Sequence, residues 1–187
     1  AMFFPYVASL VAVAVVWNML FNPEMGPVNM VLYTLGIDPK ALPRWAADRN
    51  WAMITVVLFG VWKSMGYCMV IYLAGLQGIN RDLYEAASID GAGAWQRFVY
   101  VTLPQLGPTT LFVTVMLTIQ SFKVFDQIYL LTQGGPGTST LVLVYHIYTE
   151  AFISWDLGYS SMVALVLFFV VLTVTIVQFR YTRQQTT

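Results

Sequence analysis

Charged residues, cysteine and histidine are all scarce in this chain of 187 residues, and each scarcity excludes a class of protein. Charged side chains make up 10% of the sequence, against roughly 25% in soluble globular proteins. The 9 basic and 9 acidic residues cancel, which leaves no electrostatic basis for binding nucleic acid. Cys68 is the sole cysteine and His146 the sole histidine, so neither an internal disulfide framework nor a Cys- or His-rich metal cluster is expected. We expect both side chains to be ordinary packing residues.

Apolar residues are abundant instead: 58% of the chain is hydrophobic, 16% is aromatic, and the mean hydropathy is +0.69. Such a chain has too little polar surface to cover itself in water, so its composition indicates a membrane protein. A helix needs about 20 mostly apolar residues to cross a hydrocarbon core of roughly 30 Å. We predict an all-α fold, a polytopic membrane helical bundle that forms a single transmembrane domain over residues 1–187. Its four spans are expected at residues 3–21, 51–76, 108–131 and 157–179.

The orientation of these spans should follow from Lys and Arg, because cytoplasmic loops carry an excess of both. With the segment 77–107 and the C-terminal tail inside, the cytoplasmic side holds only one basic residue more than the outside. The inner set is Arg81, Arg97, Arg180 and Arg183, and the outer set is Lys40, Arg44 and Arg49. The predicted outer ends of the spans carry Trp17, Trp45, Trp51, Tyr129 and Trp155, as an aromatic belt requires. The apolar segment 141–153 is too short to cross, so it is expected to lie on the surface or to lead into the last span.

The segment between the second and third spans is expected to contain two short helices. Asp82 is expected to cap the first, with Glu85 completing a capping box, and Gly91 suits the left-handed conformation that ends it. A helix of about eight residues is too short to be stable alone in water, so it needs a docking partner. A second helix is expected over residues 92–100, with Pro104 ending the helical run before the next span.

The same segment carries a recognisable signature: Glu-Ala-Ala, then Gly after three residues, then Ile-x-Leu-Pro after nine more. The matching residues are Glu85, Ala86, Ala87, Gly91, Leu103 and Pro104, with Val101 in place of the isoleucine. The chain thereby resembles the permease subunits of bacterial binding-protein-dependent ABC importers. Asp90, Ala92 and Phe98, together with residues 125–126 and 131–136, extend the likeness to the carbohydrate-uptake branch, of the maltose and glycerol-phosphate type.

This resemblance implies a type I ABC importer permease whose cytoplasmic coupling helix docks into a separate ATPase subunit. The implied coupling residues are Glu85, Ala86, Ala87, Asp90, Gly91, Leu103 and Pro104. The chain has no P-loop sequence, so ATP and Mg²⁺ are expected on the partner ATPase. This chain is expected to bind no cofactor or metal and to be no enzyme. The other implied partners are a second permease subunit, a second ATPase copy, an extracytoplasmic solute-binding protein, membrane lipid and a carbohydrate substrate, in the bacterial inner membrane.

The resemblance also sets expectations about length and about competing functions. Members of the family usually have more core spans than these four, so the first spans are expected upstream, and the chain alone is expected not to transport. The substrate stays open between a monosaccharide, an oligosaccharide and a glycerol phosphate. An ion-driven secondary transporter is the alternative, but it predicts acidic residues within spans, where Asp126 is the only one. A membrane enzyme would need a catalytic cluster, and the sequence contains none.

Polar and aromatic residues inside the spans are candidates for the substrate pathway, because intramembrane charges usually face a cavity or a partner. The candidates are Trp62, Lys63 and Tyr67 in the second span and Thr118, Ser121, Lys123 and Asp126 in the third. Three structural roles compete with substrate contact: an ion pair between Lys123 and Asp126, an interface with the second permease at Lys63, and helix-to-helix contacts by a polar stripe of the third span. This polar stripe consists of Thr110, Thr114, Thr118 and Ser121. Residues 134–137 predict a turn, with seating of the binding protein as a further role.

Overall fold

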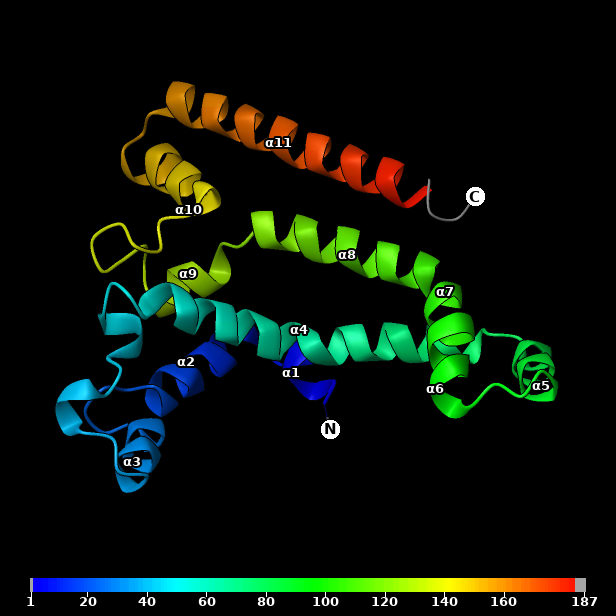
Figure 1. Ribbon diagram of the computed structural model, residues 1–187. Coiled ribbons are helices and arrows are strands. Elements are labelled where there is room, and N and C mark those ends of the chain that lie inside the picture. Colours follow the sequence, from blue (N-terminus) through cyan, green and yellow to red (C-terminus); the bar gives the residue numbers. More distant parts are fainter. Residues whose placement is uncertain (1, 184–187) are drawn as a thin grey trace. The chain divides into compact units, whose positions relative to one another are not determined.

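The computed structural model describes residues 2–183, and the side chains up to residue 180 (Figure 1). Within that range the chain consists of helices and connecting loops and has no strand, which confirms the all-α prediction. The side chain of Arg183, one of the inner charges, lies outside the described residues. The elements are α1 (Phe4–Val7), α2 (Leu10–Leu20), α3 (Pro27–Thr34), η1 (Pro39–Ala41), η2 (Trp45–Ala47), α4 (Ala52–Gln77), α5 (Arg81–Ile89), α6 (Ala94–Arg97), η3 (Phe98–Thr102), α7 (Leu103–Gln105), α8 (Gly107–Phe122), α9 (Asp126–Leu131), α10 (Leu143–Tyr148), η4 (Thr149–Ile153) and α11 (Leu157–Arg183).

Within residues 2–183, two helices are long and apolar enough to cross a membrane. They are α4, with 26 residues, and the part of α11 from Leu157 to Arg180, with 24 residues. A third crossing arises if the helical run Ala94–Gln105 and α8 count as one span, since they meet at a bend of 59°. Shorter than these, α2 is an apolar helix of 11 residues. The helical architecture is therefore that of a multi-pass membrane protein.

The expected first span, residues 3–21, is divided into α1 and α2. Ala8 and Ser9 take extended backbone conformations, with ψ of 148° and 123°, and so interrupt the helix. Hydropathy does not reveal this break, because apolar residues continue on both sides of it. The carbonyl groups that the break releases find a donor on α4, the side chain of Lys63.

The expected third span, residues 108–131, is also interrupted. Helix α8 ends at Phe122, α9 begins at Asp126, and Phe125 between them has φ −130° and ψ −61°. Lys123 and Asp126 are both exposed at this break. A continuous apolar helix would carry the two charges in its interior, where each costs about 2.5–3.5 kcal/mol on insertion scales. The break instead puts both charges at helix ends.

The chain divides into two compact units, and the first combines residues 1–66 with residues 122–169. Its core joins the apolar faces of three helices, α2, α4 and α9. The buried residues of this core are Ala14, Val56, Phe59, Ile128 and Leu131. The ring of Trp17 packs against the core and lies edge-on to that of Phe59, with the centroids 5.4 Å apart. This packing fixes α2 and α9 on the N-terminal part of α4.

The second unit combines residues 67–121 with residues 170–187. Within it, α4 and α8 approach closely at Gly75, where an added Cβ would lie 2.6 Å from Oγ1 of Thr109. Gln178 of α11 donates a hydrogen bond from Nε2 to Oγ1 of Thr118 on α8, at 2.8 Å. Small residues and interhelical hydrogen bonds are the usual means by which helices associate inside a membrane. The short helices α5, α6 and α7 belong to this unit.

Candidate coupling segment and candidate pathway residues

Helix α5 begins with a side-chain cap from Asn80, not from Asp82. The Oδ1 atom of Asn80 accepts from the backbone N–H of Asp82 at 3.0 Å, and its Nδ2 donates to Oδ2 of Asp82 at 3.1 Å. Asp82 lies in the first turn, where its carboxylate is favourable beside the helix N-terminus. The expected capping box of Asp82 and Glu85 was therefore wrong. Glu85 is left exposed on the helix surface.

Helix α5 ends at Gly91 in the way that the sequence predicts. Gly91 has φ +80°, a left-handed conformation that favours glycine. Its N–H donates to the carbonyl of Ser88 at 3.1 Å, and the N–H of Ala92 donates to the carbonyl of Ala87 at 2.9 Å. These two bonds form a Schellman motif, which pairs the last carbonyls of the helix and turns the chain. The end of the helix is thus fixed by backbone geometry.

The return segment is helical from Ala94 to Gln105, so the helix expected over residues 92–100 is longer than predicted. The run ends at Gln105, one residue past Pro104, so the proline lies in its last turn, much as predicted. Residues 98–102 form a π-helix in which the N–H of Leu103 donates to the carbonyl of Phe98. A proline in an α-helix collides with the carbonyl four residues earlier. The wider π-turn just before Pro104 relieves this collision, so the proline fits into the last turn of the run.

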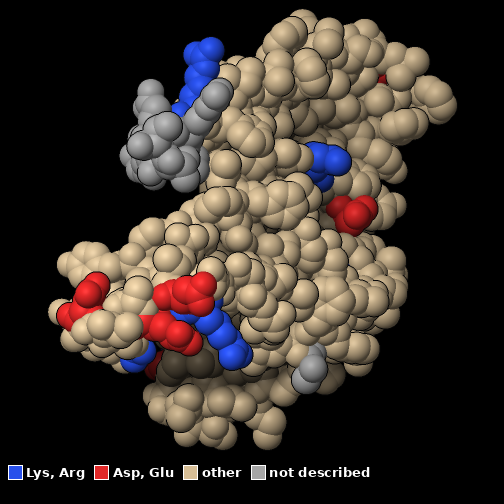
Figure 2. All heavy atoms as spheres, turned by 90° about the vertical axis from the view of Figure 1, so that its right-hand side faces the viewer, with Lys and Arg blue, Asp and Glu red and all other residues tan. Residues whose placement is uncertain are grey.

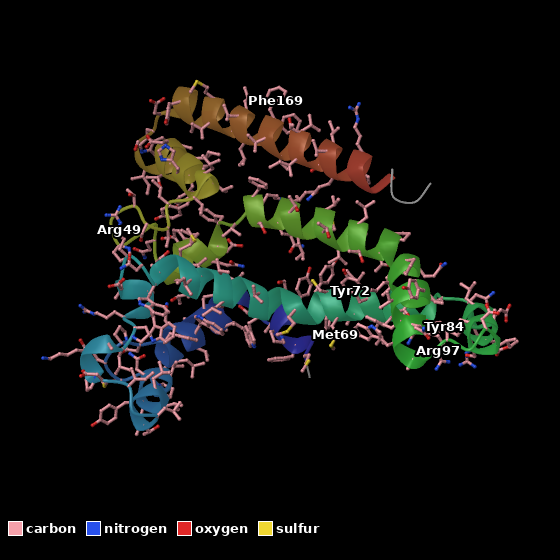
Figure 3. The ribbon with its side chains drawn as sticks, viewed as in Figure 1. Arg49, Met69, Tyr72, Tyr84, Arg97 and Phe169 are labelled. Carbon is pink, nitrogen blue, oxygen red and sulfur yellow. The ribbon has the colours of Figure 1, made fainter. Side chains whose placement is uncertain are left out.

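Two side-chain contacts fasten α5 to the return segment, and Figure 3 labels one residue of each, Tyr84 and Arg97. The hydroxyl of Tyr84 and the hydroxyl of Thr102 lie 2.9 Å apart in a hydrogen bond that is partly buried. The guanidinium of Arg97 donates to Oγ of Ser88 at 2.9 Å, and Ser88 in turn donates to the carbonyl of Tyr84 at 2.7 Å. Because both contacts cross between the two helices, α5 is held to the helix that leads into α8.

The outward surface of this segment mixes charge with large apolar side chains. Acidic and basic side chains gather over α5 on the face shown in Figure 2. Glu85, Ala86 and Asp90 of this segment are exposed, as are Leu103 and Pro104, while Ala87 is half-buried. Ile89 is 86% exposed and Trp95 is 75% exposed. Such a combination of small, charged and bulky apolar residues is typical of a surface that another protein covers.

Lys63 lies on α4 beside the break between α1 and α2. Its Nζ donates to the backbone carbonyls of Pro5, Tyr6 and Ala8, at 3.0, 3.4 and 3.3 Å. An ammonium group has three donors and no acceptor, so one lysine can serve the three carbonyls that the break releases. The half-buried side chain of Lys63 thus replaces the backbone N–H groups that a continuous helix would supply. Neither hydropathy nor helical periodicity indicates this contact.

The remaining candidate pathway residues differ in their contacts and in their exposure. The ring of Trp62 lies 5.3 Å from the ring of Trp17, in the aromatic group beside the core. Tyr67 is half-buried on α4. Oγ1 of Thr118 accepts from Gln178, so this member of the polar stripe joins two helices. Ser121 is exposed near the end of α8.

Lys123 and Asp126 form no ion pair in the part of the chain whose side chains are described. The one acid–base contact found there joins Nδ1 of His146 to Oε1 of Glu150 at 3.7 Å. Because His146 also lies 3.4 Å from the hydroxyl of Tyr159, it belongs to a polar contact between α10 and α11. Residues 2–180 contain no group of His, Cys, Asp and Glu suited to a metal ion.

The sequence matches the family described as the binding-protein-dependent transport system inner membrane component, over residues 1–184. The chain belongs to this family. Membership places it among inner membrane transport components. This family membership agrees with the structure, in which the apolar helices α4 and α11 are long enough to cross a membrane.

Relatives of this inner membrane component carry sugar-related names. The lactose transport system permease protein of Rhizobium radiobacter is 37% identical over 186 residues, with 98% of this chain and 62% of the relative covered. The sn-glycerol-3-phosphate transport system permease protein of Agrobacterium fabrum is likewise 37% identical, over 187 residues, with the same coverage of 98% and 62%. The chain thus spans about three fifths of the length of the relatives it matches.

A solved structure with the same fold comes from a bacterial ABC transporter involved in the import of the acidic polysaccharide alginate. The two chains superpose with a TM-score of 0.87 at 26% identity, over 100% of this chain and 64% of the other. A second structure of the bacterial alginate ABC transporter, in complex with an alginate pentasaccharide-bound periplasmic protein, gives the same TM-score of 0.87 at 26% identity, over 99% of this chain and 64% of the other. The resemblance to ABC importer permeases is therefore confirmed at the level of fold and family.

Proposed function

We propose that this chain is a translocation subunit of an ATP-driven ABC importer for a carbohydrate. A second permease subunit would complete the pathway, two ATPase subunits would dock on the cytoplasmic side, and an extracytoplasmic binding protein would deliver the substrate. Membership of a binding-protein-dependent transport family supports this assembly. The substrate class is supported by the names of the relatives, which refer to lactose and sn-glycerol-3-phosphate.

The observation that carries the proposal is the form of α5. A helix of 9 residues is too short to be stable by itself in water, yet α5 is capped at both ends and fastened to the return segment. It keeps Glu85, Ala86 and Asp90 exposed. A rigid, exposed element that continues through α6 and α7 toward α8 is suited to receive a push from a docked subunit. We infer that α5 is the coupling helix, that ATP and Mg²⁺ bind to the docked ATPase, and that closure of that ATPase moves α8.

We further propose that the seven candidate pathway residues line the route of the substrate. Those residues are Trp62, Lys63, Tyr67, Thr118, Ser121, Lys123 and Asp126. Flat aromatic rings and hydrogen-bonding groups are what a polyhydroxylated substrate needs, because its two ring faces are apolar and its edge is polar. Among the seven, Trp62, Ser121, Lys123 and Asp126 are exposed. Because the ring of Trp62 packs on that of Trp17 beside the core, the other three have the strongest case for substrate contact.

The test uses the intact transporter, purified through a tag on the permease and reconstituted in proteoliposomes. Glu85→Ala removes the exposed carboxylate of α5, and Gly91→Val makes its left-handed end unfavourable. Both variants are expected to lose co-purification of the ATPase subunit and ATP-dependent uptake of a labelled disaccharide, oligosaccharide or glycerol phosphate. Glu24→Ala is the matched control, because it removes an exposed carboxylate from the loop between α2 and α3, far before α5 in the sequence.

Two results would contradict the proposal. One is uptake that persists in both α5 variants and under ATP depletion, since that would indicate another energy source. The other is an equal loss of ATPase co-purification in Glu24→Ala, since that would show a general effect of removing a carboxylate. Retention of the ATPase and of uptake in Glu24→Ala, together with their loss in the α5 variants, would support the coupling role.

A further inference from the structure

Helix α3 has the reverse of the usual distribution of polar and apolar residues. Its buried residue is polar, since Asn29 is 5% exposed. Its large exposed residues are apolar: Met30, Val31 and Tyr33 are all more than half exposed. The hydroxyl of the exposed Thr34 donates to the carbonyl of Val31 in the same helix. A surface helix in water buries its apolar stripe and exposes polar residues. The arrangement of α3 is therefore unfavourable in water and favourable in an apolar environment.

The buried amide of Asn29 organises the loop around it. Its Nδ2 donates to the carbonyls of Pro23 and Pro43, each at 3.0 Å, and its Oδ1 accepts from Nε1 of Trp45 at 2.7 Å. These bonds use both amide donors and the amide oxygen. The loop is thus held together by a satisfied polar centre, which leaves its apolar side chains to point outward.

The apolar surface extends beyond the helix, and no charged residue interrupts it between Met25 and Ile37. Met25 is 86% exposed and Leu35 is 75% exposed. Leu35 is held outward by a Schellman motif, in which Gly36 has φ +91° and the N–H of Ile37 donates to the carbonyl of Leu32 at 3.2 Å. Several large apolar side chains therefore form one exposed surface on residues 25–37.

This surface is attached to two membrane helices through aromatic side chains. Figure 1 shows α3 next to the end of α2. The ring of Trp45 lies edge-on to that of Phe21, at the end of α2, with centroids 4.8 Å apart. It also contacts Trp51, which directly precedes α4, at 5.7 Å. Tryptophan is enriched where membrane helices meet the interface, so this contact indicates the level of the bilayer boundary.

We propose that the apolar surface of residues 25–37 lies in the interfacial region of the membrane, among lipid headgroups and the upper acyl chains. Three observations favour lipid as its occupant: the outward apolar side chains, the uncharged stretch, and the direct attachment to the ends of α2 and α4. Such a helix would be buried by roughly 5–10 Å at the headgroup boundary. It would anchor the loop and keep the ends of α2 and α4 at one depth.

The test measures the surroundings of Met30 in the intact transporter, reconstituted in phosphatidylethanolamine and phosphatidylglycerol nanodiscs. In a Cys68→Ser background, Met30→Cys carries an environment-sensitive fluorophore, and Lys40→Cys, an exposed charged position of the same loop, is the matched control. Two quenchers are compared: iodide in water, and lipids spin-labelled near the top of the acyl chain. We expect lipid quenching to be severalfold stronger at position 30 than at position 40, and iodide quenching to be severalfold weaker.

Two outcomes would overturn the proposal. Strong iodide quenching at position 30 would show that the surface is in water. Protection from both quenchers would show that protein covers it, either the second permease or the binding protein. Neither measurement depends on transport or ATP hydrolysis, so the result is independent of the proposed function. Leu35→Cys serves as a second site, in case a label at position 30 disturbs the loop.

Discussion

Replacing Lys63 by methionine tests whether its ammonium stabilises the broken first span. The side chain donates to three backbone carbonyls beside the break, at 3.0, 3.3 and 3.4 Å. Hydrogen bonds from a charged group are worth about 1.5–3 kcal/mol, but the two longer contacts lie outside the usual N–H···O range. Polar contacts inside membranes contribute about 0.6–1.7 kcal/mol each. Together these values give a loss of about 2 kcal/mol for the contact between α1, α2 and α4.

Removing the charge also makes α4 easier to insert into the membrane. This effect favours the variant, whereas the loss of the hydrogen bonds destabilises it. A lysine at the centre of a span costs about 2.5–3.5 kcal/mol on insertion scales. That cost applies to α4 whether or not α1 and α2 are packed against it, because helices insert before they associate. The insertion cost is therefore nearly the same before and after α1 and α2 open locally, and it largely cancels from the free energy of that opening. The net prediction is destabilisation of residues 4–20 in Lys63→Met, although the variant is more hydrophobic.

The assay is amide hydrogen exchange of residues 4–20, followed by mass spectrometry on the intact transporter in nanodiscs. A loss of about 2 kcal/mol corresponds to exchange about 30-fold faster. Lys63→Arg keeps a cationic donor and is expected to lose less than half as much protection. Lys123→Met is the control, since it removes an exposed lysine at the other break. Exchange in Lys63→Met within twofold of the wild type, or equal losses in Lys63→Met and Lys63→Arg, would refute the stabilising role of the ammonium.

Three further predictions concern the coupling segment and the outer loop. Gly91→Ala forces a Cβ into a left-handed conformation and should cost α5 about 1–2 kcal/mol, seen as faster amide exchange in that helix only. Tyr84→Phe and Thr102→Val each remove one partner of a hydrogen bond worth about 1 kcal/mol. In a double-mutant cycle measured by amide exchange of α5, the two substitutions should be coupled. Strictly additive losses of protection would argue against this contact. Asn29→Ala leaves three hydrogen-bond partners without their bond and releases Trp45 from its left-handed backbone conformation, φ +43°. Trypsin should therefore cut the loop several times faster. The control Asn50→Ala, at an exposed position, should leave the rate of cleavage unchanged.

The long helices could be predicted from sequence because membrane insertion sums over many residues. One unusual side chain changes that sum little, so the runs that became α4 and α11 stand out. The breaks at Ala8–Ser9 and at residues 123–125 could not be predicted in this way. A break needs a local partner for its free carbonyls, and at the first break that partner is Lys63, which lies 55–58 residues away in sequence. Hydropathy contains no information about that distance.

The coupling segment shows the same division between local and distant information. The role of Gly91 was predictable because a left-handed residue after a helix is a local property of the backbone. The N-cap was assigned to Asp82 and not to Asn80, since both residues are good caps and lie two positions apart. The contact of Tyr84 with Thr102 joins residues 18 positions apart, across a turn whose geometry the sequence does not specify.

The irregular parts of this chain share one physical requirement, which is that polar backbone groups need partners where water is scarce. At the break in the first span the donor is the ammonium of Lys63, and in the outer loop it is the amide of Asn29. Thr118 is likewise engaged by Gln178 between two helices. Polar side chains used in this way stabilise the fold and have fewer free groups for a substrate. Substrate contact is therefore less favoured for Lys63 and Thr118, and it is most favoured for the candidates that remain exposed beside the second break, Lys123 and Asp126.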